Sequence, residues 1–250
     1  MSHFTDHFAK VAADYAAHRP SYPAELFRWL ASVAPGRNLA WDCATGTGQA
    51  AVGLAGHFKQ VWATDASASQ IKVATQAANI TYQTAPADVS GLADSSADLV
   101  TVAQALHWFD LESFYGEVRR VLKPGGLLVV WTYGVFRAEG VDAIAVQSLL
   151  DQFYYETVGP FWPAERRHVE NGYAGLPFPF SDVATPDCGM AVNWNLDELA
   201  GYLRSWSATS RFTEQQGCDP VEPLVKQLEP LWGNERRRVV WPLSIKAGAV

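Results

Sequence analysis

Cysteine is scarce in this sequence. The 250 residues include only three cysteines, Cys43, Cys188 and Cys218. They are far apart along the chain and form neither a CxxC pair nor any spacing that is typical of metal ligands. Scattered cysteines of this kind are typical of reduced thiols in an intracellular protein. We therefore expect no disulfide framework and no bound metal.

Long apolar segments and long basic segments are also missing. No apolar run approaches the ~20 residues that cross a bilayer, and residues 1–10 carry His and Asp where a signal peptide is apolar. The formal net charge is −7, and the longest basic run is Arg236-Arg237-Arg238. Nucleic-acid binding needs a larger cationic surface. We therefore expect a cytoplasmic monomer or homodimer with neither a membrane nor a nucleic-acid partner.

The residues that are present indicate a globular chain, with 48% hydrophobic and 18% charged residues. Up to residue 133, short apolar runs alternate with segments of helical periodicity. Strands are predicted at 38–44, 60–64, 80–83, 98–103, 127–133 and 239–249. Helices are predicted at 5–18, at 23–34, from the glycines at 46 and 48 to 57, from Ser67 to 78, after Asp110 and at 196–206. Asn195 and Glu198 form a capping box for the last of these. This alternation predicts an α/β fold with a doubly wound, mostly parallel (Rossmann-like) sheet of about seven strands.

The alternation stops after Tyr133. Residues 136–185 contain one expected helix, at about 140–155, followed by a segment rich in proline and aromatic residues. Long irregular insertions within compact domains usually form lids or binding loops. We therefore predict a core of residues 1–135 and 186–250, with residues 136–185 inserted as a substrate-covering lid.

A glycine-containing turn follows the first predicted strand of the sheet. It reads Asp42-Cys43-Ala44-Thr45-Gly46-Thr47-Gly48 and leads directly into a helix. Glycines let the backbone approach a ligand closely, and the start of a helix offers free N–H donors. Asp65 ends the second strand, where an acidic residue can accept hydrogen bonds from ribose hydroxyls. Together these features indicate a cofactor that contains adenosine.

The turn alone leaves two kinds of cofactor open. Residues 46–51 also match the G-x-G-x-x-A form of the dinucleotide fingerprint, so a nicotinamide-dependent oxidoreductase is an alternative. The Asp42 carboxylate would repel a pyrophosphate but could accept a hydrogen bond from the amino group of a methionine-like tail. The fingerprint also begins behind two predicted helices, whereas dinucleotide-binding domains often start with that strand.

Several motifs, taken in order, carry a more specific resemblance. The sequence resembles class I S-adenosylmethionine (SAM)-dependent methyltransferases, and more closely their type 11 group, which includes trans-aconitate methyltransferase-like enzymes. The matching stretches cover nearly the whole chain: Phe8, Tyr15 and Arg19-Pro20-Ser21-Tyr22-Pro23, the glycine turn, Gln104-Ala105-Leu106-His107-Trp108-Phe109-Asp110, Leu122-Lys123-Pro124-Gly125-Gly126, Trp206 and Trp241-Pro242-Leu243.

The resemblance implies SAM as cofactor, S-adenosylhomocysteine as its product, and a set of cofactor contacts. These contacts are Tyr15, Arg19, Asp42, Ala44, Gly46, Gly48, Asp65, Ala66, Ala87, Asp88 and Gln104. Ala44 stands where the family usually has its first glycine, and its methyl group could crowd the cofactor. A non-catalytic, SAM-binding regulatory protein is therefore a further alternative to an enzyme.

Methyl transfer is an in-line displacement in which SAM carries the chemistry, while the protein positions the acceptor and sometimes removes a proton. His107 follows the fourth strand and is the candidate base, although it could instead only line the pocket. No Asn/Asp-Pro-Pro-Tyr motif is present, so we expect a small-molecule acceptor, methylated on a carboxylate or hydroxyl oxygen. Candidate acceptor contacts are Trp108, Tyr133, Arg166 and Arg167, although the two arginines could instead lie on a solvated helix face.

Overall fold

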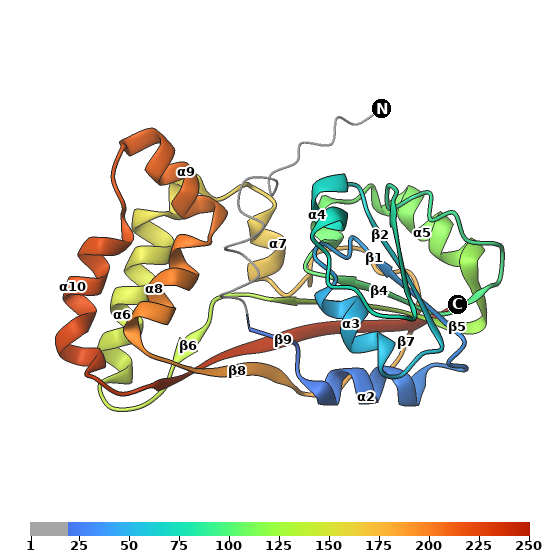
Figure 1. The fold of residues 1–250 in the computed structure, drawn as a ribbon, viewed down its shortest axis with the longest axis horizontal. Coiled ribbons are helices and arrows are strands. Elements are labelled where there is room, and N and C mark those ends of the chain that lie inside the picture. The colour runs from blue at the N-terminus through green and yellow to red at the C-terminus, as the bar shows by residue number, and fades with distance from the viewer. Residues whose placement is uncertain (1–19) are drawn as a thin grey trace.

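The computed structural model of the protein describes residues 20–250. The predicted helix at 5–18 and the expected cofactor contacts Tyr15 and Arg19 lie outside the described residues. The described chain forms a sheet with helices on both faces and, to one side of it, a second group of helices (Figure 1).

The sheet has the strand order β3-β2-β1-β4-β5-β9-β6 in the described part of the chain. Its parallel strands are β1 (Leu39–Cys43), β2 (Gln60–Asp65), β3 (Ile80–Thr84), β4 (Ala97–Ala103) and β5 (Leu122–Tyr133). Four strands pair antiparallel: β9 (Arg237–Ala249) with β5, and β6 (Arg137–Ala138), β7 (Ser181–Asp182) and β8 (Gly189–Trp194) with β9. The doubly wound, mostly parallel fold predicted from the sequence is confirmed.

Each face of the sheet is buried against helices. The helices α2 (Ala24–Val33) and α3 (Gln49–Ala55) cover one face, where they pack on Leu127, Val129 and Trp131 of β5. The helix α5 (Leu111–Val121) covers the other face and packs on Leu128 and Val130. Because both faces of these strands are buried, they form the continuous apolar runs visible in the sequence.

Two predicted helix starts are confirmed, but one helix is shorter than predicted. The Ser67 hydroxyl accepts from the Gln70 N–H at the start of α4 (Ala68–Lys72), and the Asp110 carboxylate accepts from the Ser113 N–H at the start of α5. Helix α4 ends at Lys72 rather than at residue 78. The chain then turns so that the Thr75 N–H donates to the Thr47 carbonyl, which joins this segment to the glycine turn.

The second group of helices has its own hydrophobic core. We call residues 136–162 and 189–241 the helical lobe. It contains α6 (Ala143–Gln152), the π-helical turn η2 (Phe153–Thr157), the short η3 (Gly159–Phe161), α8 (Leu196–Arg204), α9 (Ser207–Gln216) and α10 (Val221–Trp232). Its core includes Phe136, Tyr154, Trp206, Leu228 and Trp241. The predicted capping box is present, because Asn195 and Glu198 satisfy each other's backbone N–H groups.

The structure divides the chain differently from the predicted core and lid. Residues 196–232 were assigned to the core but pack against 136–162, because both faces of the parallel strands are already covered. The second half of the predicted lid leaves the helical lobe. It forms α7 (Arg166–Glu170) and then crosses the face covered by α5, where the Tyr115 hydroxyl donates to the Pro177 carbonyl at 2.7 Å.

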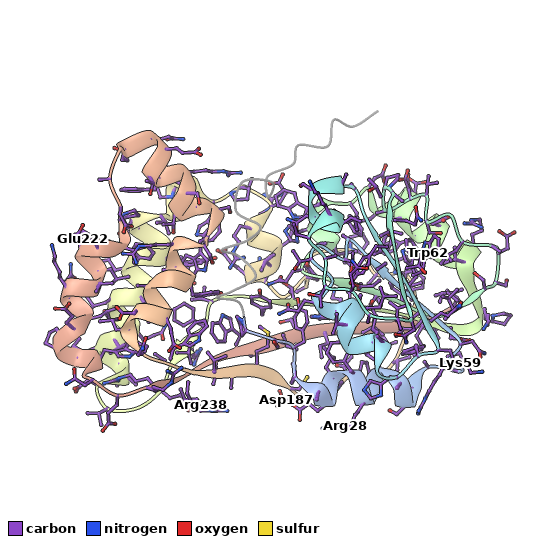
Figure 2. All side chains as sticks on the ribbon, viewed as in Figure 1. Arg28, Lys59, Trp62, Asp187, Glu222 and Arg238 are labelled. Atoms are coloured by element: carbon purple, nitrogen blue, oxygen red, sulfur yellow. The ribbon has the colours of Figure 1, made fainter. Side chains whose placement is uncertain are left out.

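Charged side chains lie on the outside of the helical lobe, as Glu222 and Arg238 show in Figure 2. Lys226 pairs with Glu222 at 2.8 Å and Arg238 pairs with Glu139 at 2.9 Å. Exposed pairs of this kind contribute little to stability, at about 0–1 kcal/mol each. Within residues 20–250, no helix has both the length and the apolar character needed to cross a membrane.

Candidate active site

The candidate site lies at the edge of the sheet where β1, β2 and β4 end. Cys43 of β1 is level with Thr64 of β2 and with Val102 of β4, so the segments after these strands begin side by side. The strand order reverses here, because the chain goes from β1 to β2 on one side and reaches β4 on the other. In doubly wound sheets, ligands bind outside the carboxyl ends of the strands at this point.

The glycine turn after β1 has three residues with left-handed backbone angles. Gly46 and Gly48 have φ values of 57° and 86°. A Cβ atom on Gly48 would lie 2.1 Å from the Tyr82 hydroxyl, so a larger residue would clash as well as strain the backbone. A Cβ atom on Gly46 would meet only the Gln70 side-chain oxygen, at 4.0 Å, among the described residues. The turn is therefore closely packed at Gly48 and open at Gly46.

Ala44 is the third left-handed residue of the turn, with φ at 54°. This angle explains why a glycine is usual at the position. A non-glycine residue in this region of φ is disfavoured by about 1–2 kcal/mol. The alanine that replaces the family's usual glycine therefore strains the backbone of the turn.

Asp42 lies beneath the turn and is fully buried. Its two carboxylate oxygens accept hydrogen bonds from the hydroxyls of Thr45 at 2.5 Å and Thr101 at 2.7 Å. Burial, opposed by these hydrogen bonds and supported by the nearby Asp65 carboxylate, raises the pKa of Asp42 to about 6. The sequence suggested direct contact between Asp42 and a ligand's amino group; in the structure the carboxylate binds the Thr45 hydroxyl of the turn itself.

Asp65 connects the turn to the next helix. One carboxylate oxygen accepts from the Gly46 N–H and the other from the Ser67 N–H, both at 2.8 Å. Ala66 follows it and is exposed. Asp65 therefore joins the glycine turn to the start of α4.

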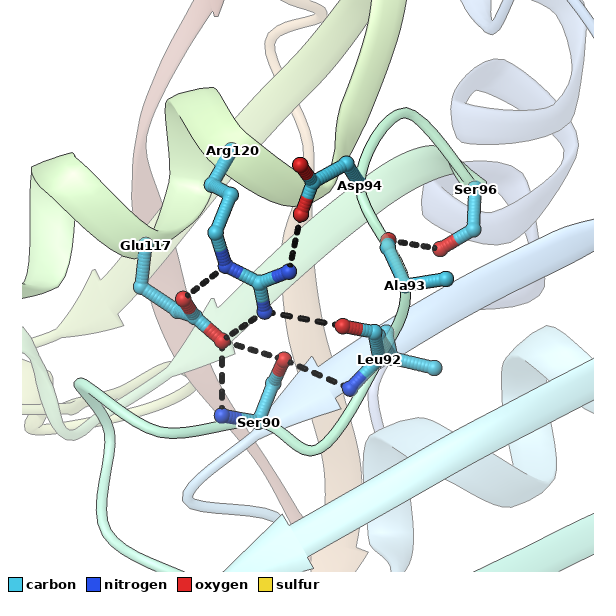
Figure 3. A network of polar contacts seen from close by, with 7 residues as sticks. All are labelled: Ser90, Leu92, Ala93, Asp94, Ser96, Glu117 and Arg120. Carbon is cyan, nitrogen blue, oxygen red and sulfur yellow. Dashed lines mark hydrogen bonds and ion pairs between the residues drawn. The ribbon is translucent and has the colours of Figure 1, made fainter.

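The loop after β3 carries Ala87 and Asp88, which are partly buried and exposed, respectively. The far end of this loop is held by a buried carboxylate, Glu117 of α5 (Figure 3). Glu117 accepts from both the N–H and the hydroxyl of Ser90, at 2.8 and 2.5 Å, and from Arg120 at 2.7 Å. Burial alone would raise the pKa of Glu117, but these hydrogen bonds outweigh it and hold the pKa at about 2.

Gln104 ends β4 in a left-handed conformation, with φ at 57°. Its amide nitrogen donates to the Tyr133 carbonyl at 3.0 Å, and its amide oxygen accepts from the Thr132 hydroxyl. The side chain is thus fixed against the end of β5, and Tyr133 itself is almost fully buried.

His107 lies in the short helix η1 (Leu106–Trp108), directly after this edge. Its Nδ1 atom is 3.1 Å from the Tyr173 hydroxyl, and its ring lies 4.8 Å from the partly exposed Trp108 ring. Burial, together with the charges of Arg166 and His168, lowers the pKa of His107 to about 3. The imidazole is therefore neutral at physiological pH.

Arg166 lies in an aromatic environment at the start of α7, a helix that packs against η1 and β5. Its guanidinium carbon is 4.7 Å from the centre of a Trp162 ring and 5.6 Å from that of Tyr154, and its Nε donates to the Tyr154 hydroxyl at 2.7 Å. The two terminal guanidinium nitrogens have no hydrogen-bond partner within residues 20–250. The buried indole N–H of Trp162 is also unpartnered. By contrast, Arg167 is exposed.

The sequence did not single out Tyr173 or Thr132, and it indicated the region of Tyr154 and Trp162 only as part of an insertion that is rich in aromatic residues. Tyr173 follows His107 by 66 positions and reaches it only through the fold. No local pattern marks such a contact. The aromatic residues near Arg166 were the one feature of the sequence that indicated this part of the site. Among the described residues, no group of three or more His, Cys, Asp or Glu side chains could hold a metal ion.

Comparison with known proteins identifies the family. The profile described as a methyltransferase domain matches residues 41–130. The chain is 34% identical to a protein of Dictyostelium discoideum named as a methyltransferase, over 90% of this chain and 85% of that protein. It is 31% identical to a protein of Saccharomyces cerevisiae named as SAM-dependent methyltransferase CRG1, over 94% of this chain and 92% of that one.

A solved structure agrees with these sequence matches. A protein of Anaeromyxobacter dehalogenans, described as a type II methyltransferase, has a TM-score of 0.86 and 42% identity, covering 92% of this chain and 97% of that one. The chain belongs to the class I SAM-dependent methyltransferases. It is therefore an enzyme that uses SAM, which decides against the nicotinamide-dependent and non-catalytic alternatives.

Proposed function

We propose that the glycine turn, Asp65, the Ala87–Asp88 segment and Gln104 form the SAM site. The open space at Gly46 and the position of Asp65, which ends β2 and binds the glycine turn, support this assignment. The turn would hold the methionine end of the cofactor, Asp65 the ribose, and Ala87 and Asp88 the adenine. Asp42 would act through Thr45, by keeping the turn in shape.

When bound, SAM supplies a methyl group on a positively charged sulfur. That methyl group would be available for in-line transfer to an acceptor oxygen, with the electrons of the carbon–sulfur bond left on sulfur. The residues of the chain hold the acceptor in line and exclude water. A carboxylate acceptor is already ionised, so this transfer requires no base.

We propose that the acceptor is a small organic acid methylated on a carboxylate oxygen. The observation that supports this most strongly is the arrangement at Arg166. Within residues 20–250, its terminal nitrogens and the indole N–H of Trp162 are donors without partners, in a partly buried aromatic environment beside His107. A guanidinium can bind a carboxylate through two parallel hydrogen bonds, and aromatic walls can bury the acceptor's apolar part.

The test is an acceptor screen in which each acid is paired with its neutral amide. It is run on the wild type, on Arg166→Ala and on the matched control Arg167→Ala. We expect turnover of acids but not of amides. Arg166→Ala should raise KM for acids by roughly 10–150-fold, which corresponds to losing a hydrogen bond to a charged group. Arg167→Ala should behave as the wild type, because this neighbouring side chain is exposed.

Arg166 also packs on two aromatic rings, so its loss could disturb the fold. Thermal unfolding and S-adenosylhomocysteine binding of both variants control for this effect. Equal turnover of acids and amides, or an Arg166→Ala enzyme with wild-type KM for acids, would remove the carboxylate proposal while leaving the methyltransferase assignment unaffected.

A further inference from the structure

Tyr173 and His107 form a hydrogen-bonded pair at the candidate site. Tyr173 is only 1% exposed and lies in the segment after α7, held in a left-handed conformation with φ at 63°. Its hydroxyl lies 3.1 Å from Nδ1 of His107, and the Thr132 side chain and the Leu106 backbone also form hydrogen bonds with it. The Lys246 ammonium donates to the Tyr173 backbone carbonyl at 2.6 Å, which holds this segment against β9. The tyrosine is thus a fixed partner for one particular nitrogen of the imidazole.

The direction of this hydrogen bond follows from the surroundings of both rings. A phenol O–H is a stronger donor than the N–H of a neutral imidazole, because its proton is more acidic. The groups that face His107 from α7 are Arg166 and His168, and both disfavour a positive charge on the ring. The third neighbour, Trp108, carries no charge. We infer that His107 stays neutral and that its Nδ1 accepts a hydrogen bond from the Tyr173 hydroxyl.

We propose that Tyr173 is a positioning residue that fixes His107 in the neutral form with its proton on Nε2. The two ring nitrogens point in nearly opposite directions, so Nε2 is directed away from the buried tyrosine. This Nε2–H then donates to the carboxylate oxygen that does not receive the methyl group, an inference that rests on the proposed carboxylate acceptor. His107 then orients the acceptor and removes no proton, which agrees with a transfer that releases none.

The protonation state can be read without any acceptor. NMR of the histidine ring nitrogens distinguishes the Nε2–H form, the Nδ1–H form and the imidazolium, and His107→Gln identifies the His107 signals. We expect the Nε2–H form in the wild type from about pH 5 to pH 8. Tyr173→Phe should give a mixture of the two neutral forms. A wild-type spectrum showing Nδ1–H or imidazolium would overturn the proposal, and that result stands even if Tyr173→Phe does not fold.

Kinetics test the role of Nε2–H. Glutamine can donate through its side-chain N–H but cannot take up a proton at neutral pH, whereas alanine can do neither. We expect His107→Ala to lower kcat/KM by roughly 10–150-fold, as for a lost hydrogen bond to a charged group. His107→Gln should recover most of this loss, and S-adenosylhomocysteine affinity should stay at the wild-type level in both.

Two other outcomes would overturn this role. A His107→Gln enzyme as impaired as His107→Ala would indicate a base. Loss of cofactor binding in folded variants would place His107 in the cofactor site. These outcomes are separate from failure of the carboxylate proposal, which the comparison of acids with amides detects in the wild type alone.

Discussion

At the scale of single residues, the proposed cofactor site depends on side chains that bind the backbone of the glycine turn. Asp65 bonds the N–H groups of Gly46 and Ser67 and is proposed to accept from the ribose as well. We predict that Asp65→Ala weakens S-adenosylhomocysteine binding by roughly 10–150-fold, the effect of losing hydrogen bonds to a charged group. Calorimetric titration measures this loss. Asp88→Ala, which removes an exposed carboxylate from the same site, should have a smaller effect.

Thermal unfolding of the free protein distinguishes binding from folding in this test. Asp65→Ala should lower the unfolding temperature, because two turn N–H groups lose their acceptor. If the variant is folded and still binds S-adenosylhomocysteine as tightly as the wild type, the assignment of Asp65 to the ribose is wrong.

The sequence revealed the role of a residue where that role is set by its neighbours along the chain. The positive φ values of Gly46 and Gly48 follow from a turn whose pattern lies within a few residues. By contrast, Asp42 is hydrogen-bonded to Thr101 and His107 to Tyr173, both far away in the chain. Those partners are set by the packing of strands and by the segment after α7, so no local pattern could predict them.

At the scale of elements, the Glu117–Arg120 pair joins α5 to the loop that carries the proposed adenine contacts (Figure 3). We predict that Glu117→Gln lowers the free energy of unfolding by about 2 kcal/mol at neutral pH, the value of a hydrogen bond to a charged group. Urea unfolding measures the change. The matched control is Glu222→Gln, which disrupts an exposed pair on α10 and should cost under about 1 kcal/mol.

The Glu117–Arg120 pair also predicts that the free energy of unfolding depends on pH. The pKa of Glu117 is about 2 in the folded protein and 4.5 when unperturbed, so the unfolded chain binds the proton first as pH falls. The stabilisation is complete above pH 4.5 and is lost as pH falls towards 2. The difference between the wild type and Glu117→Gln should therefore shrink over this interval. If the stability difference between the two proteins stays constant down to about pH 2, the charge of Glu117 is not the cause of the stabilisation.

Elements were predicted best where the apolar pattern lies within one continuous segment. The strands β1 to β4 and the starts of α4, α5 and α8 are close to the predicted positions, whereas β5 begins at Leu122 and not at residue 127. Helices α8 to α10 share a hydrophobic core with residues 136–162, which their sequences did not indicate, because an amphipathic pattern shows that a helix has an apolar face but not which surface covers it.

At the scale of the whole molecule, the long strand β9 links the sheet to the helical lobe (Figure 1). Its second half pairs with β5, where Ile245 is level with Trp131. Its first half pairs with β8 and β6, and Trp241 packs on Phe136 at 5.4 Å in the core of the lobe. Since one continuous strand belongs to both cores, neither can lose it without disturbing the other.

We therefore predict that the sheet and the helical lobe unfold together. Leu228→Ala removes a fully buried side chain from α10 in the lobe, and Leu99→Ala removes one from β4 in the sheet. Each should lower the free energy of unfolding by about 2–5 kcal/mol, because each leaves a cavity. Hydrogen exchange in urea, followed by mass spectrometry, reports on peptides from α10 and from β2 separately. Both peptides should lose protection at one urea concentration in each variant, and S-adenosylhomocysteine should raise that concentration for both. If Leu228→Ala lowers the midpoint of the α10 peptide alone, the lobe unfolds as an independent unit and β9 does not couple the two cores.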